Sequence, residues 1–341
     1  MKKRLLALSL ASTFTLPPVS ADDFVPAQVI NKNYDQLTNT SPRASRLEGI
    51  NLSSYVVDEN GQVSDIEIVA TAGQKKYQRE AIDYVSKLNY KSARINGNAV
   101  PTAKTIKVSS QNVHASFSND QASPGFFDDY KKASQLIDDK KYDEAKTYIT
   151  ELENEHTKNT VEIVLLAWLK SQHSYFVKDW EKFDKHIYEA FLFRDNLPDQ
   201  IKKRVIKNAL QWFISKQDFV RAYDAIDALD NIDSIIFSEQ NKAQLLAQVN
   251  DIYKNSGEIS QQISLESEQA VLPLLSKSEV ELKSDKPLSK VQLRCENKVV
   301  NYDLSTIDKI EISKNDVRCG LLIKSTFAQT VTLKQSGKSF L

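Results

Sequence analysis

The segment from Leu47 to Val108 constrains the fold of this 341-residue chain more than any other part of it. Two runs rich in β-branched residues flank the pair Asn60-Gly61, which stands where a two-residue hairpin turn needs positive φ. After Gln74 the apolar residues recur at helical spacing, which gives one stripe that can face the hairpin: Tyr77, Ala81, Tyr84, Val85 and Leu88. The segment is therefore predicted to form strand, hairpin, strand, amphipathic helix, loop and strand.

Three motifs follow one another in this segment: Val57-Asp58-Glu59-Asn60-Gly61-Gln62-Val63-Ser64-Asp65, the helix end Leu88-Asn89-Tyr90-Lys91-Ser92-Ala93, and Asn96-Gly97-Asn98-Ala99-Val100-Pro101. Their order resembles the C-terminal domain of TonB, the periplasmic protein that drives outer-membrane transporters. The chain departs from the family pattern at three points. Ser41-Pro42 replaces a Tyr-Pro pair, Leu88 replaces a Trp, and Ser92 replaces a Pro. We interpret residues 47–110 as a TonB-like domain.

The resemblance implies a binding mechanism. TonB C-terminal domains capture a short segment of an outer-membrane receptor as an added strand, because the backbone groups of an edge strand can pair with an extended peptide. Here the edge would be the strand Thr102–Ser110, with these partner-binding residues: Lys104, Thr105, Ile106, Lys107 and Val108. Alternation along a strand puts Ile106 and Val108 on the face opposite Lys107. An edge covered by the polar linker or by the helical region is the alternative interpretation.

Residues 1–21 have the pattern of a secretory signal peptide. A basic start precedes the apolar stretch Leu5–Leu16, and Val19-Ser20-Ala21 supplies small residues for cleavage after Ala21. The alternative is an uncleaved inner-membrane anchor, but as a helix the apolar stretch would span only about 18 Å of a bilayer core that is about 30 Å thick. We expect an exported, periplasmic protein without stable membrane insertion after cleavage, in which residues 22–46 lead into the TonB-like domain.

The charge and the cysteine content of the chain fit an exported, periplasmic protein. Lys plus Arg and Asp plus Glu each total 45, so no net field favours nucleic acid as a partner. The only cysteines, Cys295 and Cys319, are expected to form a disulfide in an oxidising compartment, with two buried free thiols as the alternative. No His or further Cys lies near them in sequence, so a metal site is not expected.

A helical pattern occupies residues 126–263, after a polar linker at 111–125. It contains a weak repeat, in which Lys140, Lys178 and Lys216 recur at intervals of 38 residues, each in a polar turn followed by an aromatic residue. A fourth, degenerate copy begins at Asn255. Paired helices that stack along the chain show such periods, and the turn resembles tetratricopeptide (TPR) repeats, although their period is about 34 residues. We expect a TPR-like helical array.

The aromatic residues of this helical region allow two interpretations. Trp168, Trp180 and Trp212, with neighbouring Phe and Tyr residues, would suit a ligand-binding surface. Most of them lie at helical spacing from other apolar residues, so we favour packing in the core.

Residues 273–341 change to a period of two, typical of an antiparallel β domain of sandwich or barrel type. The alternating apolar positions are Val280/Leu282, Val291/Leu293/Cys295, Ile310/Ile312 and Val331/Leu333. The whole chain is therefore interpreted as a multidomain α+β protein.

Residues for catalysis are hard to find. None of the four histidines has neighbouring residues in the pattern of a metal site or a catalytic triad: His114, His156, His173 and His186. The Gly-x-Ser-x-Gly motif of a nucleophile elbow does not occur. No glycine-rich phosphate-binding loop occurs either, and the whole chain has only eight glycines. We expect neither an enzyme nor a bound cofactor.

The favoured hypothesis is a periplasmic, non-catalytic adaptor that binds protein partners, either a receptor segment or another protein of the TonB system. A short energy transducer with an uncleaved anchor is the first alternative, and an envelope enzyme with an unrecognised site is the second. The chain has no long Pro-rich spacer, and an untethered chain cannot transmit force from an inner-membrane motor, which argues against the transducer.

Overall fold

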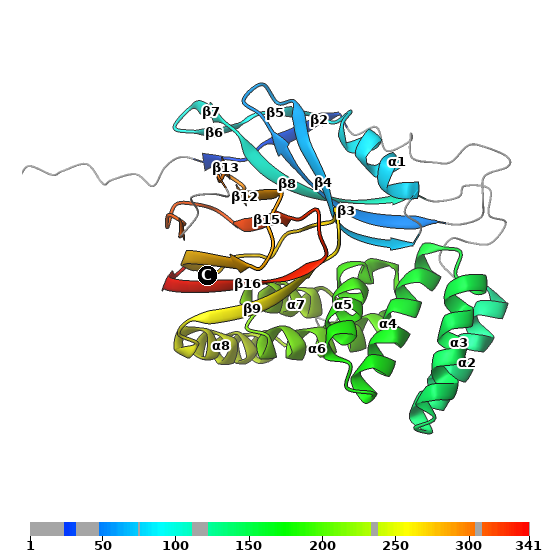
Figure 1. The fold of residues 1–341 in the computed structure, drawn as a ribbon. Coiled ribbons are helices and arrows are strands. Elements are labelled where there is room, and N and C mark those ends of the chain that lie inside the picture. The colour runs from blue at the N-terminus through cyan, green and yellow to red at the C-terminus, as the bar shows by residue number, and fades with distance from the viewer. Residues whose placement is uncertain are drawn as a thin grey trace, which may run out of the picture.

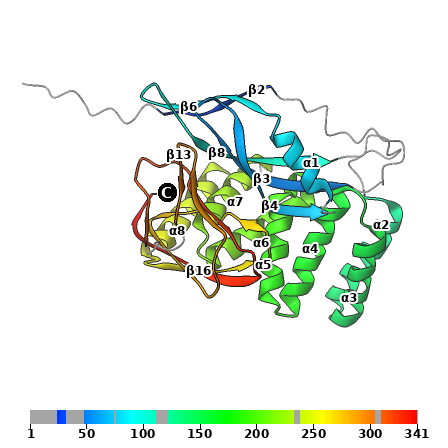
Figure 2. The same ribbon diagram turned by 45° about the horizontal axis from the view of Figure 1, so that its top comes forward.

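A computed structural model describes residues 24–31, 48–73, 76–110, 122–232, 238–303 and 309–340. An N-terminal sheet region (residues 24–110) lies across a helical array (124–255) and a C-terminal β region (259–340), as Figures 1 and 2 show. The expected signal peptide, most of the lead-in segment and residues 111–121 of the expected linker lie outside the described residues.

The N-terminal region contains the predicted hairpin, helix and last strand. Strands β3 (Gly49–Val57), β4 (Val63–Gly73) and β8 (Thr102–Ser110) form an antiparallel sheet in the order β4-β3-β8. Helix α1 (Lys76–Val85) packs on one face of it. The five apolar positions predicted for the helical stripe are all buried, with at most 5% of each residue exposed. The helix ends at Val85, before Leu88, and three short strands stand where a loop was expected: β5 (Asn89–Lys91), β6 (Ala93–Ile95) and β7 (Asn98–Val100).

The prediction of a two-residue turn at Asn60-Gly61 is wrong. The loop runs from Asp58 to Gln62, and of these residues only Gly61 has positive φ, at 82°. The Asp58 carboxylate accepts hydrogen bonds from the backbone N–H groups of Asn60 (2.9 Å) and Gln62 (2.8 Å), which stabilises the longer loop. The two-residue turn with both φ values positive instead occurs at Asn96-Gly97, between β6 (Ala93–Ile95) and β7 (Asn98–Val100).

The lead-in segment contributes two short strands. β1 (Phe24–Val25) pairs with β6, and β2 (Gln28–Asn31) pairs with β5 (Asn89–Lys91). Residues before the hairpin are thus part of the same small fold. Strands this short carry no alternation from which they could be recognised.

The helical array consists of consecutive helices that pack against one another (Figure 1). Their bounds are α2 (Pro124–Asp138), α3 (Tyr142–Glu151), α4 (Thr160–Phe176), α5 (Trp180–Leu192), α6 (Asp199–Ser215), α7 (Phe219–Ile232) and α8 (Glu239–Asn255). A π-helical turn (Leu152–His156) extends α3, and a 3₁₀ turn, η3 (Arg194–Asn196), precedes α6.

Three of the turns share one geometry. Lys140, Lys178 and Gln217 have φ values of 60°, 60° and 56°. In each turn the following N–H group donates to a carbonyl five residues earlier, at 2.8, 2.9 and 2.8 Å, as in a Schellman helix end. The predicted lysine register therefore holds for the first two turns and is off by one at the third, where Gln217 and not Lys216 has the left-handed conformation. The relation to TPR repeats stays a prediction.

The helical part ends earlier than expected. Helix α8 ends at Asn255, and residues Ile259–Leu265 form strand β9 instead of continuing the helical pattern to residue 263. Ile259 and Leu265 are buried at the two ends of a strand whose residues alternate in exposure, and β9 pairs with β16. The sequence near Asn255 is thus a helix end that is followed by a strand.

The C-terminal region contains two four-stranded antiparallel sheets. One has the order β10-β15-β12-β13 and the other β14-β11-β16-β9. Their strands are β10 (Ala270–Val271), β11 (Lys277–Ser284), β12 (Lys290–Cys295), β13 (Lys298–Asn301), β14 (Ile310–Glu311), β15 (Gly320–Lys324) and β16 (Gln329–Ser339). The sheets share one hydrophobic core. Cys295 and Cys319, both buried members of this core, form the predicted disulfide.

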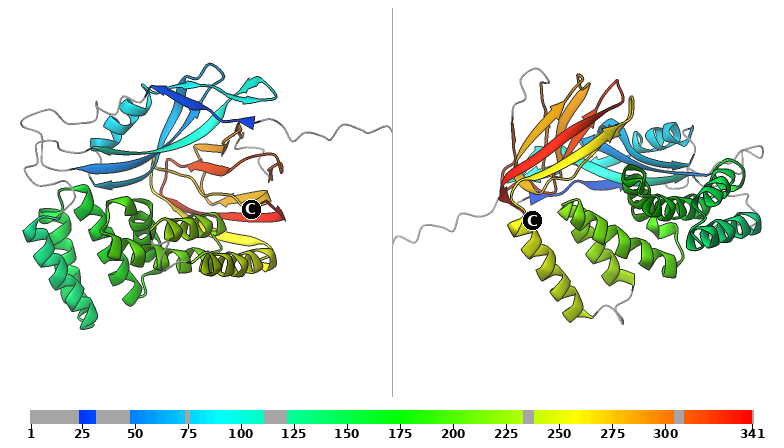
Figure 3. Two further views of the ribbon diagram at one scale, coloured as in Figure 1. Left: turned by 180° about the vertical axis from the view of Figure 1, so that it is seen from behind. Right: turned by 60° about the horizontal axis from the view of Figure 1, so that its bottom comes forward.

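The second face of the β4-β3-β8 sheet is covered by the other two regions. Ile50 and Ala70 belong to the hydrophobic core of the helical array, and Val69 packs with Ala270 and Leu322 of the C-terminal region. Figure 3 shows both regions on the same side of the N-terminal sheet. This packing holds the edge of that sheet in a fixed orientation.

Candidate partner-binding edge

Strand β8 forms one edge of its sheet. It pairs with β3 along its whole length, from Thr102 opposite Val57 to Ser110 opposite Gly49. Within the described ranges, no backbone-to-backbone hydrogen bond joins the other side of β8 to another segment. An edge of this kind can accept an additional strand.

The side chains of β8 alternate as predicted. Ile106 and Val108 pack in the cluster beneath α1, where only 2% of Val108 is exposed. Lys107 points to the other side, where its Nζ lies 3.1 Å from the carboxylate of Asp195 in η3. Ile106 and Val108 therefore face the small core, whereas Lys107 faces the helical array.

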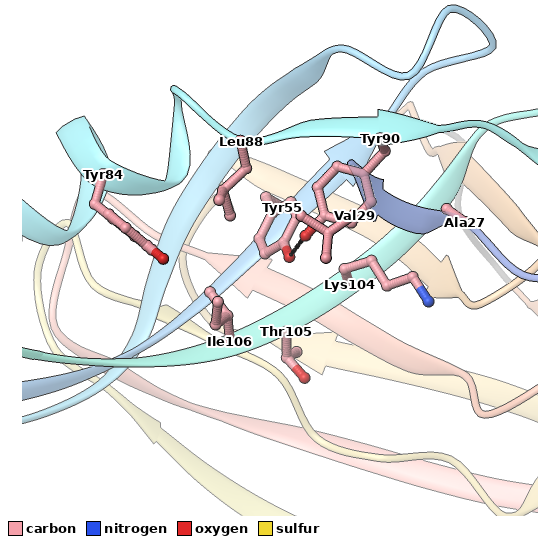
Figure 4. Close-up of a pocket in the computed structure, with 9 residues that line it drawn as sticks. All are labelled: Ala27, Val29, Tyr55, Tyr84, Leu88, Tyr90, Lys104, Thr105 and Ile106. Carbon is pink, nitrogen blue, oxygen red and sulfur yellow. Dashed lines mark hydrogen bonds between the residues drawn. The ribbon is translucent and has the colours of Figure 1, made fainter. Parts of the chain in front are cut away.

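A cavity of about 250 Å³ opens beside the middle of β8 (Figure 4). Three of the five predicted partner-binding residues line it: Lys104, Thr105 and Ile106. The other lining residues come from β2, β3, α1, β5 and the segments beside them, and are Ala27, Val29, Tyr55, Tyr84, Leu88 and Tyr90. Lys107 and Val108 are not among the lining residues.

Most of the cavity wall is aromatic or aliphatic. The hydroxyl oxygens of Tyr55 and Tyr90 lie 2.5 Å apart in a hydrogen bond, and both residues are buried. Figure 4 shows Ile106 on the side of β8 that faces Tyr55, the Thr105 side chain on the other side, and the Lys104 ammonium group directed away from the hydroxyl pair. The cavity can therefore hold an apolar side chain, next to a cation and an open strand edge.

Comparison with known families assigns this region. Residues 41–109 match the family of the Gram-negative bacterial TonB protein C-terminal domain. These residues are a TonB-type C-terminal domain. The match confirms the resemblance, and it implies protein–protein interaction within the TonB system. A search of curated proteins found no match to the chain.

The two ends of β8 are attached to regions outside the TonB-type domain. At the start of the strand, the Thr102 hydroxyl donates a hydrogen bond to the carbonyl of Glu296 in the C-terminal region. Towards the end, Lys107 pairs with Asp195. Burial alone would raise the pKa of Asp195, but the charge and hydrogen bond of Lys107, together with Arg194 and Lys202, hold it below its usual value. The cavity lies between these two attachments.

A polar cluster fixes the TonB-type domain to the C-terminal region. Asp65 on β4 contacts Lys290, accepts a hydrogen bond from Gln292 (2.8 Å) and lies 3.2 Å from Arg294. Glu67 lies 3.3 Å from both Lys290 and Lys324. Burial alone would raise the pKa of Asp65, but these hydrogen bonds and charges lower it below its usual value. The partners are more than 220 positions apart in sequence, so no local pattern indicates the cluster.

The residues considered for metal binding or catalysis have structural contacts. Cys295, Cys319 and Asp316 lie close together, but the two sulfur atoms form the disulfide and are not thiolate ligands. His173 hydrogen-bonds to the Tyr142 carbonyl (3.0 Å), and His186 lies 3.1 Å from Glu189. His114 lies outside the described residues.

In the part of the chain that the structure describes, no helix is long and apolar enough to cross a bilayer.

Proposed function

We propose that this protein is a periplasmic, non-catalytic adaptor whose TonB-type domain captures an extended segment of a partner protein at β8. The backbone groups on the outer side of β8 would pair with the segment, and the neighbouring cavity would hold one of its apolar side chains. The observation that carries the proposal is the coincidence of an open edge strand with a cavity lined by Lys104, Thr105 and Ile106. Domains of this family belong to the TonB system, which supports a role in TonB-dependent outer-membrane transport.

The fixed orientation of the domain supports an adaptor over a transducer. In the proposal, the TPR-like array holds a second partner while the TonB-type domain holds the first. Glu48 links the two regions, because its carboxylate accepts a hydrogen bond from the backbone N–H of Thr160 (2.8 Å) at the start of α4. Contacts of this kind would keep the two binding surfaces at a constant separation.

A crosslinking experiment tests the edge-strand mechanism. A photo-reactive amino acid at Thr105, which is exposed on β8, is expected to crosslink the full-length protein to a partner in the bacterial envelope. The matched control carries the same group at Asp83, an exposed position on α1. Equal crosslinking from both positions, or none from Thr105, would contradict recognition at β8.

A proline substitution provides the second test. Ile106→Pro removes a backbone N–H group from β8 and is expected to abolish recovery of the partner in a pull-down. Circular dichroism and thermal unfolding must show that the variant remains folded. Recovery of the same proteins by a folded Ile106→Pro variant would disprove strand addition at this position.

A further inference from the structure

Aromatic side chains of the helical array gather at the turn between α4 and α5. Trp168 is buried as expected, but the core packing expected for Trp180 is wrong, because 46% of this residue is exposed. Its ring stacks on that of Trp212 at 6.1 Å between centroids. Exposed charges of both signs, Lys178 and Glu181, flank the turn, so its chemistry favours no one class of partner. The cavity beside β8 is more selective, because most of its wall is apolar and side chains from several elements line it.

Residues 24–31 precede the part of the chain that matches the TonB family, yet they belong to the same small fold. Strand β1 pairs with β6, and Val29 of β2 stands opposite Tyr90 of β5. Val29 packs against the cluster beneath α1, and Ala27 is a buried member of that cluster, with 7% of it exposed. This N-terminal segment is therefore part of the domain, although the family match begins only at residue 41.

The N-terminal segment supplies one wall of the cavity beside β8. Ala27 and Val29 line the cavity together with the middle of β8. Figure 4 shows Val29 next to the tyrosine hydroxyl pair. The alternate residues, Gln28 and Ile30, are exposed. The segment thus presents Ala27 and Val29 to the cavity and the residues between and after them to the exterior.

These two residues leave room for a ring. The cavity has a volume of about 250 Å³, and an engineered apolar cavity of about 150 Å³ is large enough to accept benzene. The side chain of Ala27 is a single methyl group. That of Val29 is short and β-branched, which restricts it at χ1 and makes it a stiff wall. A larger side chain at either position would reduce the space, so the size of these residues limits what can enter.

The chemistry of the wall favours an uncharged aromatic occupant. Three tyrosines line the cavity, and rings that pack edge to face or offset gain energy beyond the area that they bury. None of the nine lining residues is acidic, so a basic side chain would be buried there without a carboxylate. The one cation among them, Lys104, directs its ammonium group away from the tyrosine hydroxyl pair (Figure 4). An acidic side chain next to that pair would therefore lie away from the positive charge.

We propose that Ala27 and Val29 are specificity-determining residues of the β8 site and that they admit an aromatic side chain of the partner segment. The inference rests on the function proposed for β8. It extends the recognition unit to residues 24–110, because the family match alone leaves out one wall of the cavity. The segment that precedes the family domain would thus decide which partners the edge strand accepts.

Peptide selection identifies the preferred side chain. The probe is a phage-displayed library of random eight-residue peptides, selected on the immobilised full-length protein. The selected sequences are expected to share one aromatic position. Replacing that residue by Ala in a synthetic copy of a selected peptide should weaken binding, measured by calorimetry, at least about tenfold. A folded Ile106→Pro variant should not bind the selected peptide, which assigns the peptide to β8.

Variants of the N-terminal segment test the two residues. Val29→Phe adds a ring to the cavity wall, and Ala27→Leu adds a branched side chain. Each should weaken binding of the aromatic peptide at least about tenfold and leave the affinity of its Ala copy unchanged, because only the ring competes for the space. Val29→Ala enlarges the cavity and should shift the selected residue towards Trp.

The matched control is Ile30→Phe. It adds the same ring to the outer face of β2, where 71% of Ile30 is exposed, and it should leave the affinity for the aromatic peptide unchanged. Circular dichroism and thermal unfolding show whether each variant is folded. Val29→Ala removes atoms instead of adding them, so it tests the same wall if the larger side chains prevent folding.

Three results would overturn the inference and leave the function proposed for β8 intact, provided that Ile106→Pro still abolishes binding. They are selected peptides with no shared aromatic position, unchanged affinity and selection in the folded variants at Ala27 and Val29, and an equal loss of affinity in Ile30→Phe. If Ile106→Pro binds the selected peptide as tightly as the wild type, strand addition at β8 is wrong and the inference fails with it. A library from which no peptide is enriched would contradict both.

Discussion

The guanidinium group of Arg294 donates a hydrogen bond to the backbone carbonyl of Asp65 (2.9 Å) and lies 3.2 Å from the carboxylate of the same residue. Only 1% of the Arg294 side chain is exposed. A further hydrogen bond runs from Arg294 to the hydroxyl of Ser54 (2.8 Å). One buried arginine of the C-terminal region thus satisfies polar groups on two strands of the TonB-type domain, which explains why these regions pack as one body.

Replacing this arginine is expected to destabilise the protein. Arg294→Met leaves the Ser54 hydroxyl and the backbone carbonyl of Asp65 without their donor and should lower the free energy of unfolding by about 2–3 kcal/mol, because buried polar groups are left unsatisfied. Urea unfolding followed by circular dichroism measures the change. Lys286→Met, at an exposed position, is the control. A loss below about 0.5 kcal/mol would show that the contact is energetically neutral.

Acid is expected to weaken the same interface. The pKa of Asp65 is lowered in the folded protein from its ordinary value of 3.8. Its stabilising contribution is therefore complete above the unfolded-state value and is lost as the pH falls through the lower, folded-state value. Asp65→Asn should therefore cost more stability at pH 7 than at about pH 3, which lies below the unfolded-state value. Unfolding curves at both values of pH test this, and an equal cost at both would contradict the assignment.

Sequence patterns predicted the parts of the fold that depend on local spacing. Tyr77, Ala81 and Tyr84 repeat at helical intervals within α1, so the stripe that faces the sheet could be recognised from a few turns of helix. The edge position of β8 followed from the resemblance to the TonB family, and the disulfide followed from cysteine count and compartment.

Two kinds of feature could not be predicted in this way: turns decided by a competing local hydrogen bond, and contacts between distant residues. Asn60-Gly61 has the composition of a two-residue turn, but hydrogen bonds to the Asp58 carboxylate favour a longer loop. Tyr55 lies on β3 and Tyr90 on β5, and only the folded chain brings their hydroxyl groups together beside a cavity. The contacts of Asp65 join segments whose separation in sequence exceeds any local period.

Reduction of the disulfide is expected to destabilise the C-terminal region. Cys295 and Cys319 close a loop with a sequence separation of 24, for which loop entropy predicts a contribution of about 3–4 kcal/mol. The double variant Cys295→Ala with Cys319→Ala should unfold at a lower urea concentration than the oxidised protein. The reduced wild type should behave like this variant. Identical midpoints for all three forms would show that the bridge adds no stability.

The N-terminus of the exported protein distinguishes an adaptor from an anchored transducer. Cleavage after Ala21 would give a mature chain that begins Asp22-Asp23-Phe24. We expect sequencing of protein recovered from the periplasm to give this start. An intact Met1 in protein recovered from the inner membrane would support the transducer instead, because only a tethered chain can transmit force.

Filling the cavity beside β8 should separate partner binding from stability. Ile106 is partly buried, packs in the cluster beneath α1 and lines the cavity, so Ile106→Phe adds a ring to a space of about 250 Å³. Filling a cavity commonly leaves the free energy of unfolding unchanged or slightly raised. A partner side chain that normally enters the space would be excluded, and we expect affinity for the partner recovered by crosslinking to fall at least about tenfold. The larger cavity of Ile106→Ala should retain binding while it costs stability. If Ile106→Phe binds as tightly as the wild type, the partner pairs with the backbone of β8 without using the cavity.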